Sequence, residues 1–225
     1  FISFQSAGTV YDLGAAVFTS LSLSSNKMMS STAVNFISGA VDSANIAVGG
    51  FATVTNCRMP ATTTPLTGVS TNNARWNFTS NDEIQDTRPD SLLALSSQTT
   101  TVITTVNVAT LVLGTFTVIS SAQMTATAAG RSTYEGERPA ALPITANLTI
   151  EPFSGTGKTI SAYLAKNGTK IALSRVQSTM SATLPENLTV VWQDTFVNGD
   201  YYEIFVENNT DAINLIVKNA VLRVN

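Results

Sequence analysis

The chain of 225 residues contains no histidine and a single cysteine, Cys57. Without histidine it lacks the side chain that most often acts as a general base and most often binds transition metals. One cysteine excludes a disulfide within the chain and a zinc site built from several cysteines. We therefore expect no catalytic residues, no metal ligands and no cofactor, and we interpret Cys57 as a buried structural thiol.

Charged residues are also scarce, at 12% of the chain, which is about half the usual fraction in soluble globular domains. The 12 Lys and Arg are scattered and the net charge is −3, so no basic patch predicts binding to nucleic acid. No apolar run approaches the roughly 20 residues of a membrane-spanning helix, and no secretory signal peptide is visible. We expect the chain neither to bind nucleic acid nor to insert into a membrane. Because the chain begins with Phe1 rather than Met, we expect a processed product or a part of a longer protein.

Serine and threonine take the place of the missing charges: 23 Ser and 33 Thr make up a quarter of the chain. Threonine favours strands and is a poor helix former. The composition therefore predicts an all-β protein and argues against a helical bundle. A chain of this length can form one large β domain or two smaller ones.

Short apolar segments recur about every ten residues between residues 41 and 84, set among Asn, Gly, Ser and Thr. Phe51–Cys57 and Ala74–Phe78 are two of them. Such spacing is typical of the strands of a sandwich or the rungs of a β-solenoid. Asn and Gly also tolerate the left-handed backbone angles that solenoid corners need. We expect sandwich strands here and keep solenoid rungs as the alternative.

The segment 130–139, Gly-Arg-Ser-Thr-Tyr-Glu-Gly-Glu-Arg-Pro, is dense in turn-forming residues. We place a domain boundary before it. Residues 1–129 are then a β-rich N-terminal region, and residues 130–225 an antiparallel jelly-roll or β-sandwich domain.

Two turns and one strand stand out in this second domain. Asn167-Gly168 separates two apolar runs, and Asn-Gly is the strongest short hairpin signal because both central residues of a type I′ turn need positive φ. Gly199-Asp200 precedes an alternating segment in which Tyr202, Ile204 and Val206 share one face. We interpret Asn167 and Gly168 as a structural hairpin turn and the shared strand face as packed in the core.

Two groups of side chains suggest carbohydrate chemistry, and each has a plainer interpretation. Four carboxylates gather between residues 82 and 90: Asp82, Glu83, Asp86 and Asp90. Paired carboxylates cleave glycans or bind Ca²⁺, but a solvated loop is our expectation. Four aromatic residues offer a possible sugar-stacking platform: Trp76, Trp192, Tyr201 and Tyr202. Aromatic residues on strands are more often core or interface, and we expect that here.

The final segments resemble the closing strands of a known family. Asn198–Asn208, Leu215–Val217 and Ala220–Val224 form a turn with Gly-Asp-aromatic, an alternating strand, a polar turn and a last strand. This pattern resembles trimeric jelly-roll heads: tumour-necrosis-factor-like domains and the tips of phage fibres and virion spikes. Gly130–Tyr134 and Tyr163–Thr169 are similar to the opening strands of such domains. The resemblance also implies that Gly199 and Asp200 lie in the turn that leads into a packed strand, so their role is structural rather than catalytic. The resemblance covers about residues 115 to 225, and residues 45–87 are similar to terminal β-solenoid rungs of phage spikes.

The resemblance implies a non-enzymatic structural protein on the virion surface of a bacteriophage. It implies a homotrimer in which each protomer contributes an apolar flank to the threefold axis, and other capsid or tail proteins as partners. The position on the particle stays open between a capsid decoration or head fibre and a receptor-binding tail fibre or spike, with a host surface glycan as a possible ligand. No coiled-coil stalk is visible in the chain. Two alternatives remain: a carbohydrate-binding adhesin module and a glycan-degrading tailspike fragment.

Overall fold

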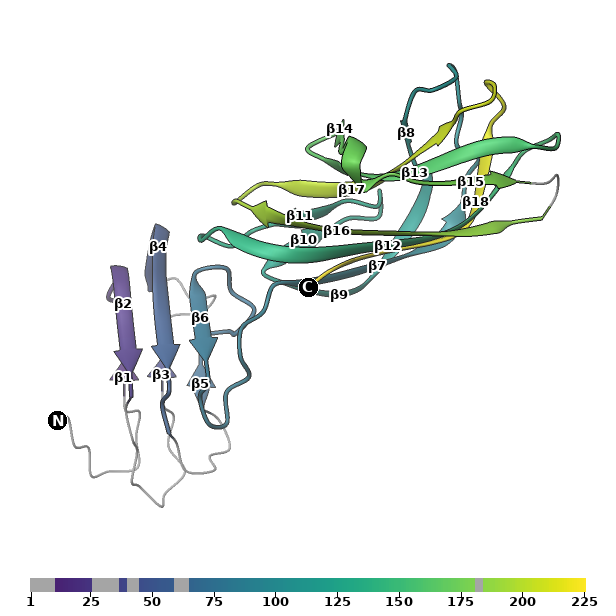
Figure 1. The fold of residues 1–225 in the computed structure, drawn as a ribbon. Coiled ribbons are helices and arrows are strands. Elements are labelled where there is room, and N and C mark those ends of the chain that lie inside the picture. The colour runs from purple at the N-terminus through teal and green to yellow at the C-terminus, as the bar shows by residue number, and fades with distance from the viewer. Residues whose placement is uncertain (1–10, 26–36, 40–44, 59–64, 181–183) are drawn as a thin grey trace. The chain divides into compact units, whose positions relative to one another are not determined.

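The computed structural model of the chain describes residues 11–25, 37–39, 45–58, 65–180 and 184–225. Within these residues every regular element is a β-strand except for one short 3-10 turn, which confirms the all-β class. The chain forms two compact units, Phe1–Arg88 and Pro89–Asn225 (Figure 1). We call them the solenoid unit and the jelly-roll unit and describe each by itself.

The boundary between the units lies between Arg88 and Pro89, whereas the sequence led us to place it at residue 130. The reason is pairing at long range. Strand β7 (Asp90–Gln98) pairs with β18 (Leu215–Val224), and β9 (Gly114–Ala122) pairs with β7. The turn-rich segment contains β11 (Ser132–Tyr134), which pairs within the same unit.

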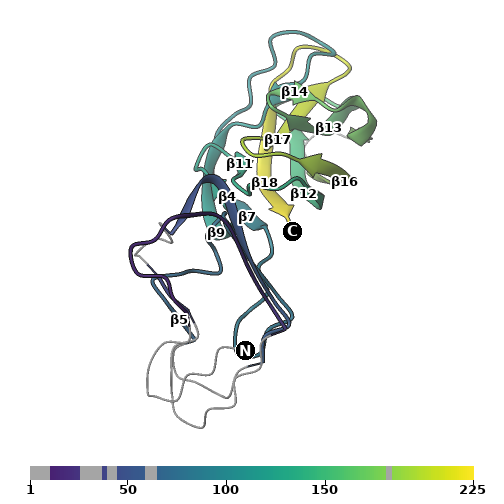
Figure 2. The same ribbon diagram turned by 90° about the vertical axis from the view of Figure 1, so that its left-hand side faces the viewer.

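The solenoid unit consists of three rungs, and each rung supplies one strand to each of two parallel three-stranded sheets. One sheet contains β1 (Tyr11–Asp12), β3 (Ile37–Ser38) and β5 (Leu66–Thr67); the other contains β2 (Phe18–Ser24), β4 (Ile46–Thr55) and β6 (Trp76–Thr79). Tyr11 pairs with Ile37 and Ile37 with Leu66, so the chain returns to the same sheet once in every rung. Figure 2 shows the successive turns of the chain lying over one another. The expectation of sandwich strands was wrong, and the solenoid alternative is the fold; residues 41–44 and 59–64 of that stretch lie outside the described residues.

Inward side chains stack from rung to rung in the solenoid unit. Leu23 is opposite Val54, which is opposite Phe78, and all three are buried. The rings of Trp76 and Phe78 are stacked, with centroids 5.6 Å apart. Asn45 is buried at a corner and donates to the carbonyl oxygens of Gly14 (3.0 Å) and Ala16 (2.8 Å) on the preceding rung. Cys57 is a buried free thiol in this core, as predicted.

The jelly-roll unit is a sandwich of two sheets, visible as two layers in Figure 1. Its further strands are β8 (Thr110–Leu111), β10 (Met124–Ala126), β12 (Ala140–Pro152), β13 (Lys158–Lys166), β14 (Thr169–Lys170), β15 (Val176–Met180), β16 (Glu186–Phe196) and β17 (Tyr201–Asn208), with the 3-10 turn η2 at Ala172–Ser174. The five-stranded sheet has the order β16-β12-β18-β7-β9, and β11, β17, β13 and β15 are neighbours in the other sheet.

The pairing is nested, which defines the jelly roll. Strand β7 pairs with β18, β11 with β17, β12 with β16 and β13 with β15, so the first strand of the set meets the last and the middle two meet each other. This arrangement confirms the predicted jelly-roll architecture. The core between the sheets is apolar, and Phe196 contacts Tyr134 and Tyr202 there with ring centroids 5.9 and 4.7 Å away.

Candidate functional site

The two predicted turns lie side by side and are joined by hydrogen bonds. Asn167 and Gly168 have φ of 52° and 74°, as a type I′ turn requires, and Gly199 has φ of 86°. The Asn167 amide donates to Asp200 Oδ1 (2.8 Å), and Asn167 Oδ1 accepts from the Tyr201 backbone N–H (2.9 Å). These hydrogen bonds therefore join two hairpin ends that are distant in the sequence.

A lysine and two carboxylates complete this cluster. Lys166 Nζ lies 2.9 Å from Asp200 Oδ2 and 3.6 Å from Asp194 Oδ2. Burial would raise the pKa of Asp200, but hydrogen bonds from the Val197 backbone, Asn167 and Lys166 outweigh it, and the pKa is lowered. The Tyr202 hydroxyl donates to Asp194, and its pKa is raised, first by burial and then by that carboxylate. The cluster is internally satisfied, since each charge has an opposite charge or a donor beside it.

The strand face predicted to be packed lies in the core: Tyr202, Ile204 and Val206 are at most 1% exposed. The opposite face of β17 is also buried, which the sequence did not predict. Glu203 there accepts two hydrogen bonds from Arg131, each 3.0 Å long. Glu207 pairs with Lys170 at 2.7 Å.

The other sheet of the sandwich has seven strands, and its outer surface is therefore covered by the chain's own cations. Arg131 also lies over the Tyr201 ring, 3.8 Å from its centroid, and Lys170 lies 4.6 Å from the Tyr163 centroid. Arg175 Nε donates to Ser161 Oγ (3.0 Å). The sequence signal for this covered surface was the pair Glu203 and Glu207 on one side of β17. Carboxylates on that side of a strand need partners when they are buried.

The four carboxylates between residues 82 and 90 do not form a single site. Asp82 and Glu83 are exposed, and Asp86 accepts a hydrogen bond from the Ser80 backbone N–H (2.6 Å). Asp90 belongs to β7 of the other unit and accepts from Ser120. Within the described residues, no group of three His, Cys, Asp or Glu is placed to hold a metal ion.

The four aromatic residues considered as a sugar platform are not brought together either. Trp76 is buried in the solenoid unit, while Tyr202 is buried in the jelly-roll core and Trp192 packs against that core. Tyr201 is half-buried beneath Arg131. Three of these aromatic side chains, Trp76, Tyr202 and Trp192, therefore lie in a core or pack against one.

The outward face of the five-stranded sheet, which we call the outer face, is a broad surface that no other described part of the jelly-roll unit covers. The cross-strand pairing aligns the residues at its centre in three rows: Val191–Thr145–Arg223–Leu92–Ser120, Thr189–Asn147–Val221–Ala94–Thr117 and Asn187–Thr149–Asn219. Arg223 is the one charged residue in these rows. On the outer face Val191 is 66% exposed, and Leu92 and Val221 are half-buried.

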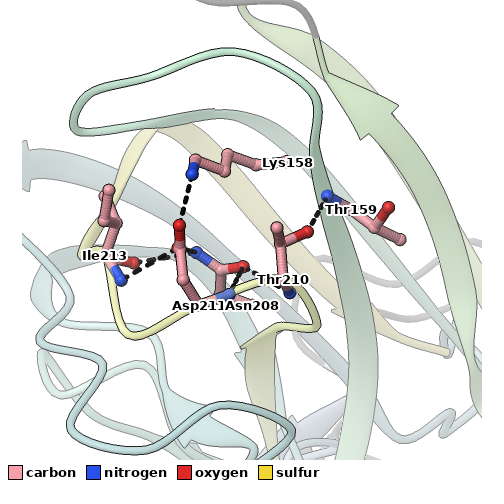
Figure 3. Close-up of polar contacts among 6 residues, drawn as sticks. All are labelled: Lys158, Thr159, Asn208, Thr210, Asp211 and Ile213. Carbon is pink, nitrogen blue, oxygen red and sulfur yellow. Dashed lines mark hydrogen bonds and ion pairs between the residues drawn. The ribbon is translucent and has the colours of Figure 1, made fainter.

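The loops at one end of the sandwich form a second surface, on the side away from the C-terminus (Figure 1). They carry exposed apolar side chains, namely Val102, Val106, Val108, Phe153 and Leu184. Figure 3 shows how one of these loops is held: Asn208 Nδ2 donates to Asp211 Oδ1 and to the Ile213 carbonyl (both 3.0 Å), and Thr210 Oγ1 accepts from the Thr159 backbone N–H (2.8 Å). Lys158 forms an ion pair with Asp211, which holds the pKa of that carboxyl below its ordinary value.

No family model matches the chain, and no curated protein matches it by sequence. Several solved structures are similar to it. The globular domain of zebrafish complement 1qA protein is 12% identical with a TM-score of 0.42, and 61% of this chain covers 96% of that chain. Eiger TNF from S. frugiperda is 15% identical with a TM-score of 0.41, covering 61% and 93% of the two chains. The PRD1 vertex protein P5 is 17% identical with a TM-score of 0.39, covering 60% and 96%. At these values the likenesses do not place the chain in a family.

No helix in the part of the chain that the structure describes is long and apolar enough to cross a membrane.

Proposed function

We propose that this chain is a non-enzymatic structural protein on the surface of a bacteriophage virion, where it assembles as a homotrimer. The outer face of the five-stranded sheet is the observation that carries the proposal. Interface cores are depleted of charged residues relative to the rest of a protein surface. The central rows of the outer face have one charge, Arg223, and expose Val191. Like copies can approach through such a face with little electrostatic repulsion.

The outer surface of the other sheet differs from the outer face, and this difference supports the outer face as the interface. Its outer surface is closed by Arg131–Glu203 and Lys170–Glu207 and needs no further cover. Among the described residues, the outer face lacks ion pairs of this kind across its centre, and Lys218–Glu151 (3.0 Å) lies at an end of the sheet. The outer face differs from the apolar flank expected from the resemblance, because it is mostly hydroxyl and amide with apolar residues among them.

The partners that we propose are other copies of this chain and other capsid or tail proteins. Immunogold labelling of purified phage particles that encode the chain, with an antibody against it, tests this location. We expect gold at the particle surface and, at fixed copy number, at either the head or the tail. Purified particles without gold, with the chain detected by the antibody only as unassembled protein in the lysate, contradict the proposal.

Binding of a host surface glycan is the second candidate, favoured by the loop end of the jelly-roll unit. Phe153 is 61% exposed there, and an exposed aromatic ring on a surface loop suits stacking on a sugar. A glycan array probed with the wild type and with Phe153→Ser tests it. Signals that are lost in the variant support a receptor-binding position; an array without signals contradicts it. A reducing-sugar assay on host polysaccharide with Asp82→Asn and Asp86→Asn variants tests the glycan-degrading alternative.

A further inference from the structure

Two identical triplets face each other across strands β12 and β16. Asn147-Leu148-Thr149 runs antiparallel to Asn187-Leu188-Thr189, with Asn147 opposite Thr189 and Thr149 opposite Asn187. Thr149 Oγ1 donates to Asn187 Oδ1 (2.7 Å), and Thr189 Oγ1 donates to Asn147 Oδ1 (2.8 Å). The four polar residues form a reciprocal set on the outer face, which we call the Asn–Thr box. The two leucines point into the core and are buried.

The box uses only part of its hydrogen-bonding capacity. A primary amide has two N–H donors and an oxygen that accepts up to two hydrogen bonds. Each asparagine oxygen accepts one threonine hydroxyl, and among the described residues neither amide nitrogen has a protein partner. Asn147 and Asn187 are both exposed. The box therefore presents donors and acceptors together on a face whose central rows carry one charge, Arg223.

A partner that covers this face must satisfy the amides, because a buried donor without an acceptor is costly. A purely apolar partner fails this condition, and an acidic or basic one gains no opposite charge in the central rows except at Arg223. A second copy of the chain can satisfy the amides, since an amide that donates to the next copy also accepts from the previous one. Under rotational symmetry such bonds close into a ring.

We propose that the Asn–Thr box sets the register of self-association, with the amide N–H groups of Asn147 and Asn187 donating to asparagine oxygens of neighbouring copies. The inference rests on the proposed homotrimer and names the residues that fix its geometry. Neighbouring Val191, Val221 and Ala94 bury apolar area without directional preference. Directional amide bonds then select one arrangement, as single buried asparagines do in coiled coils.

The test is the distribution of mass in solution for three variants beside the wild type. In Asn147→Asp with Asn187→Asp, the carboxylates still accept from the threonines but carry no donors at pH 7. We expect the three-chain fraction to fall at least tenfold, with unchanged circular dichroism. In Asn147→Leu with Asn187→Leu, we expect several species in place of one. Gln177→Leu, an exposed amide on β15 of the other sheet, is the matched control and keeps the wild-type mass.

The outcomes separate this inference from the proposed function. A trimeric wild type with dissociated Asp variants and a trimeric control supports both. A trimeric wild type whose Asp and Leu variants keep a single three-chain mass overturns the role of the box and leaves the trimer standing. A monomeric wild type overturns the trimer and the box together.

Discussion

At the scale of single residues, burial on both faces of β17 decides what each side chain tolerates. Ile204 and Val206 pack into the apolar core, whereas Glu203 and Glu207 on the other face survive burial only because Arg131 and Lys170 neutralise them. The same strand therefore accepts a carboxylate at alternate positions and rejects it at the positions between. Each face of the strand therefore gives its own prediction.

Ile204→Asp places an unpaired carboxylate in the jelly-roll core. We expect a loss of more than about 4 kcal/mol of unfolding free energy, enough to prevent folding or assembly. Leu173→Asp is the control, because Leu173 is 85% exposed and its replacement leaves folding intact. Urea unfolding followed by circular dichroism measures both. An Ile204→Asp variant with wild-type melting and mass would show that the strand face is assigned the wrong way round.

Arg131→Met leaves the Glu203 carboxylate buried without its guanidinium. We expect a cost of about 2 kcal/mol, because Arg131 is itself partly exposed and water can replace some of its contact. Adding Glu203→Gln removes the uncompensated charge, so the double variant should regain at least half of the loss. A double variant less stable than Arg131→Met would contradict this electrostatic explanation.

Asp200 gives the jelly-roll unit a stability component that depends on pH. Its pKa is lowered in the folded chain from an ordinary value of about 3.8, so the ionised form is favoured by folding. The contribution is complete above the unfolded pKa and is lost as the pH falls through the lower, folded pKa. Thermal unfolding between pH 7 and pH 2 should show a smaller decline for Asp200→Asn than for the wild type. Parallel declines would exclude this source.

At the scale of elements, the sequence predicted what depends on local signals. The Asn167-Gly168 hairpin and the alternating strand at 202–206 follow from turn chemistry and from the period of two, and both lie where local reasoning put them. The first strand of the jelly roll, β7, was missed because its partner β18 is the last strand of the chain. No local pattern marks such a pairing.

The solenoid rungs were hard to recognise for a related reason. Each rung carries a polar–apolar–polar triplet: Ser22-Leu23-Ser24, Thr53-Val54-Thr55 and Asn77-Phe78-Thr79. The central residues of the triplets stack in the core. The number of residues between the first and second triplets differs from the number between the second and third. A repeat this irregular is not visible in the sequence as a fixed period. The same lack of a fixed spacing concealed the Asn–Thr box, whose two triplets are far apart in the sequence but meet in register.

A substitution at Gly130 tests how closely the β10–β11 turn approaches the core. Its φ is +83°, and a Cβ there would lie 2.7 Å from Cε2 of the buried Phe116. Gly157 has φ of +66° and open space around it. Both alanine variants carry the strain of a left-handed backbone, about 1 kcal/mol, and Gly130→Ala adds a clash of about 1–3 kcal/mol. Equal losses in thermal unfolding for the two variants would show that Phe116 yields freely.

At the scale of the whole molecule, assembly depends on how a sheet face with few charges is covered. The chain has few charges, a net charge of −3 and an outer face with one charge in its central rows. Association through such a face depends on apolar burial and hydrogen bonds, which salt screens little. We expect the assembled mass to be nearly the same at low salt and at high salt, in contrast to an assembly held by surface ion pairs.

The most direct measurement is the mass of the wild-type chain in solution, by light scattering after size exclusion. We expect a single species near three times 23.7 kDa. Val191→Asp, which puts a charge on the outer face, should dissociate that species, and Leu173→Asp should not. A wild-type mass of one chain at micromolar concentration, unchanged by either substitution, would contradict the homotrimer and its assembly through the outer face.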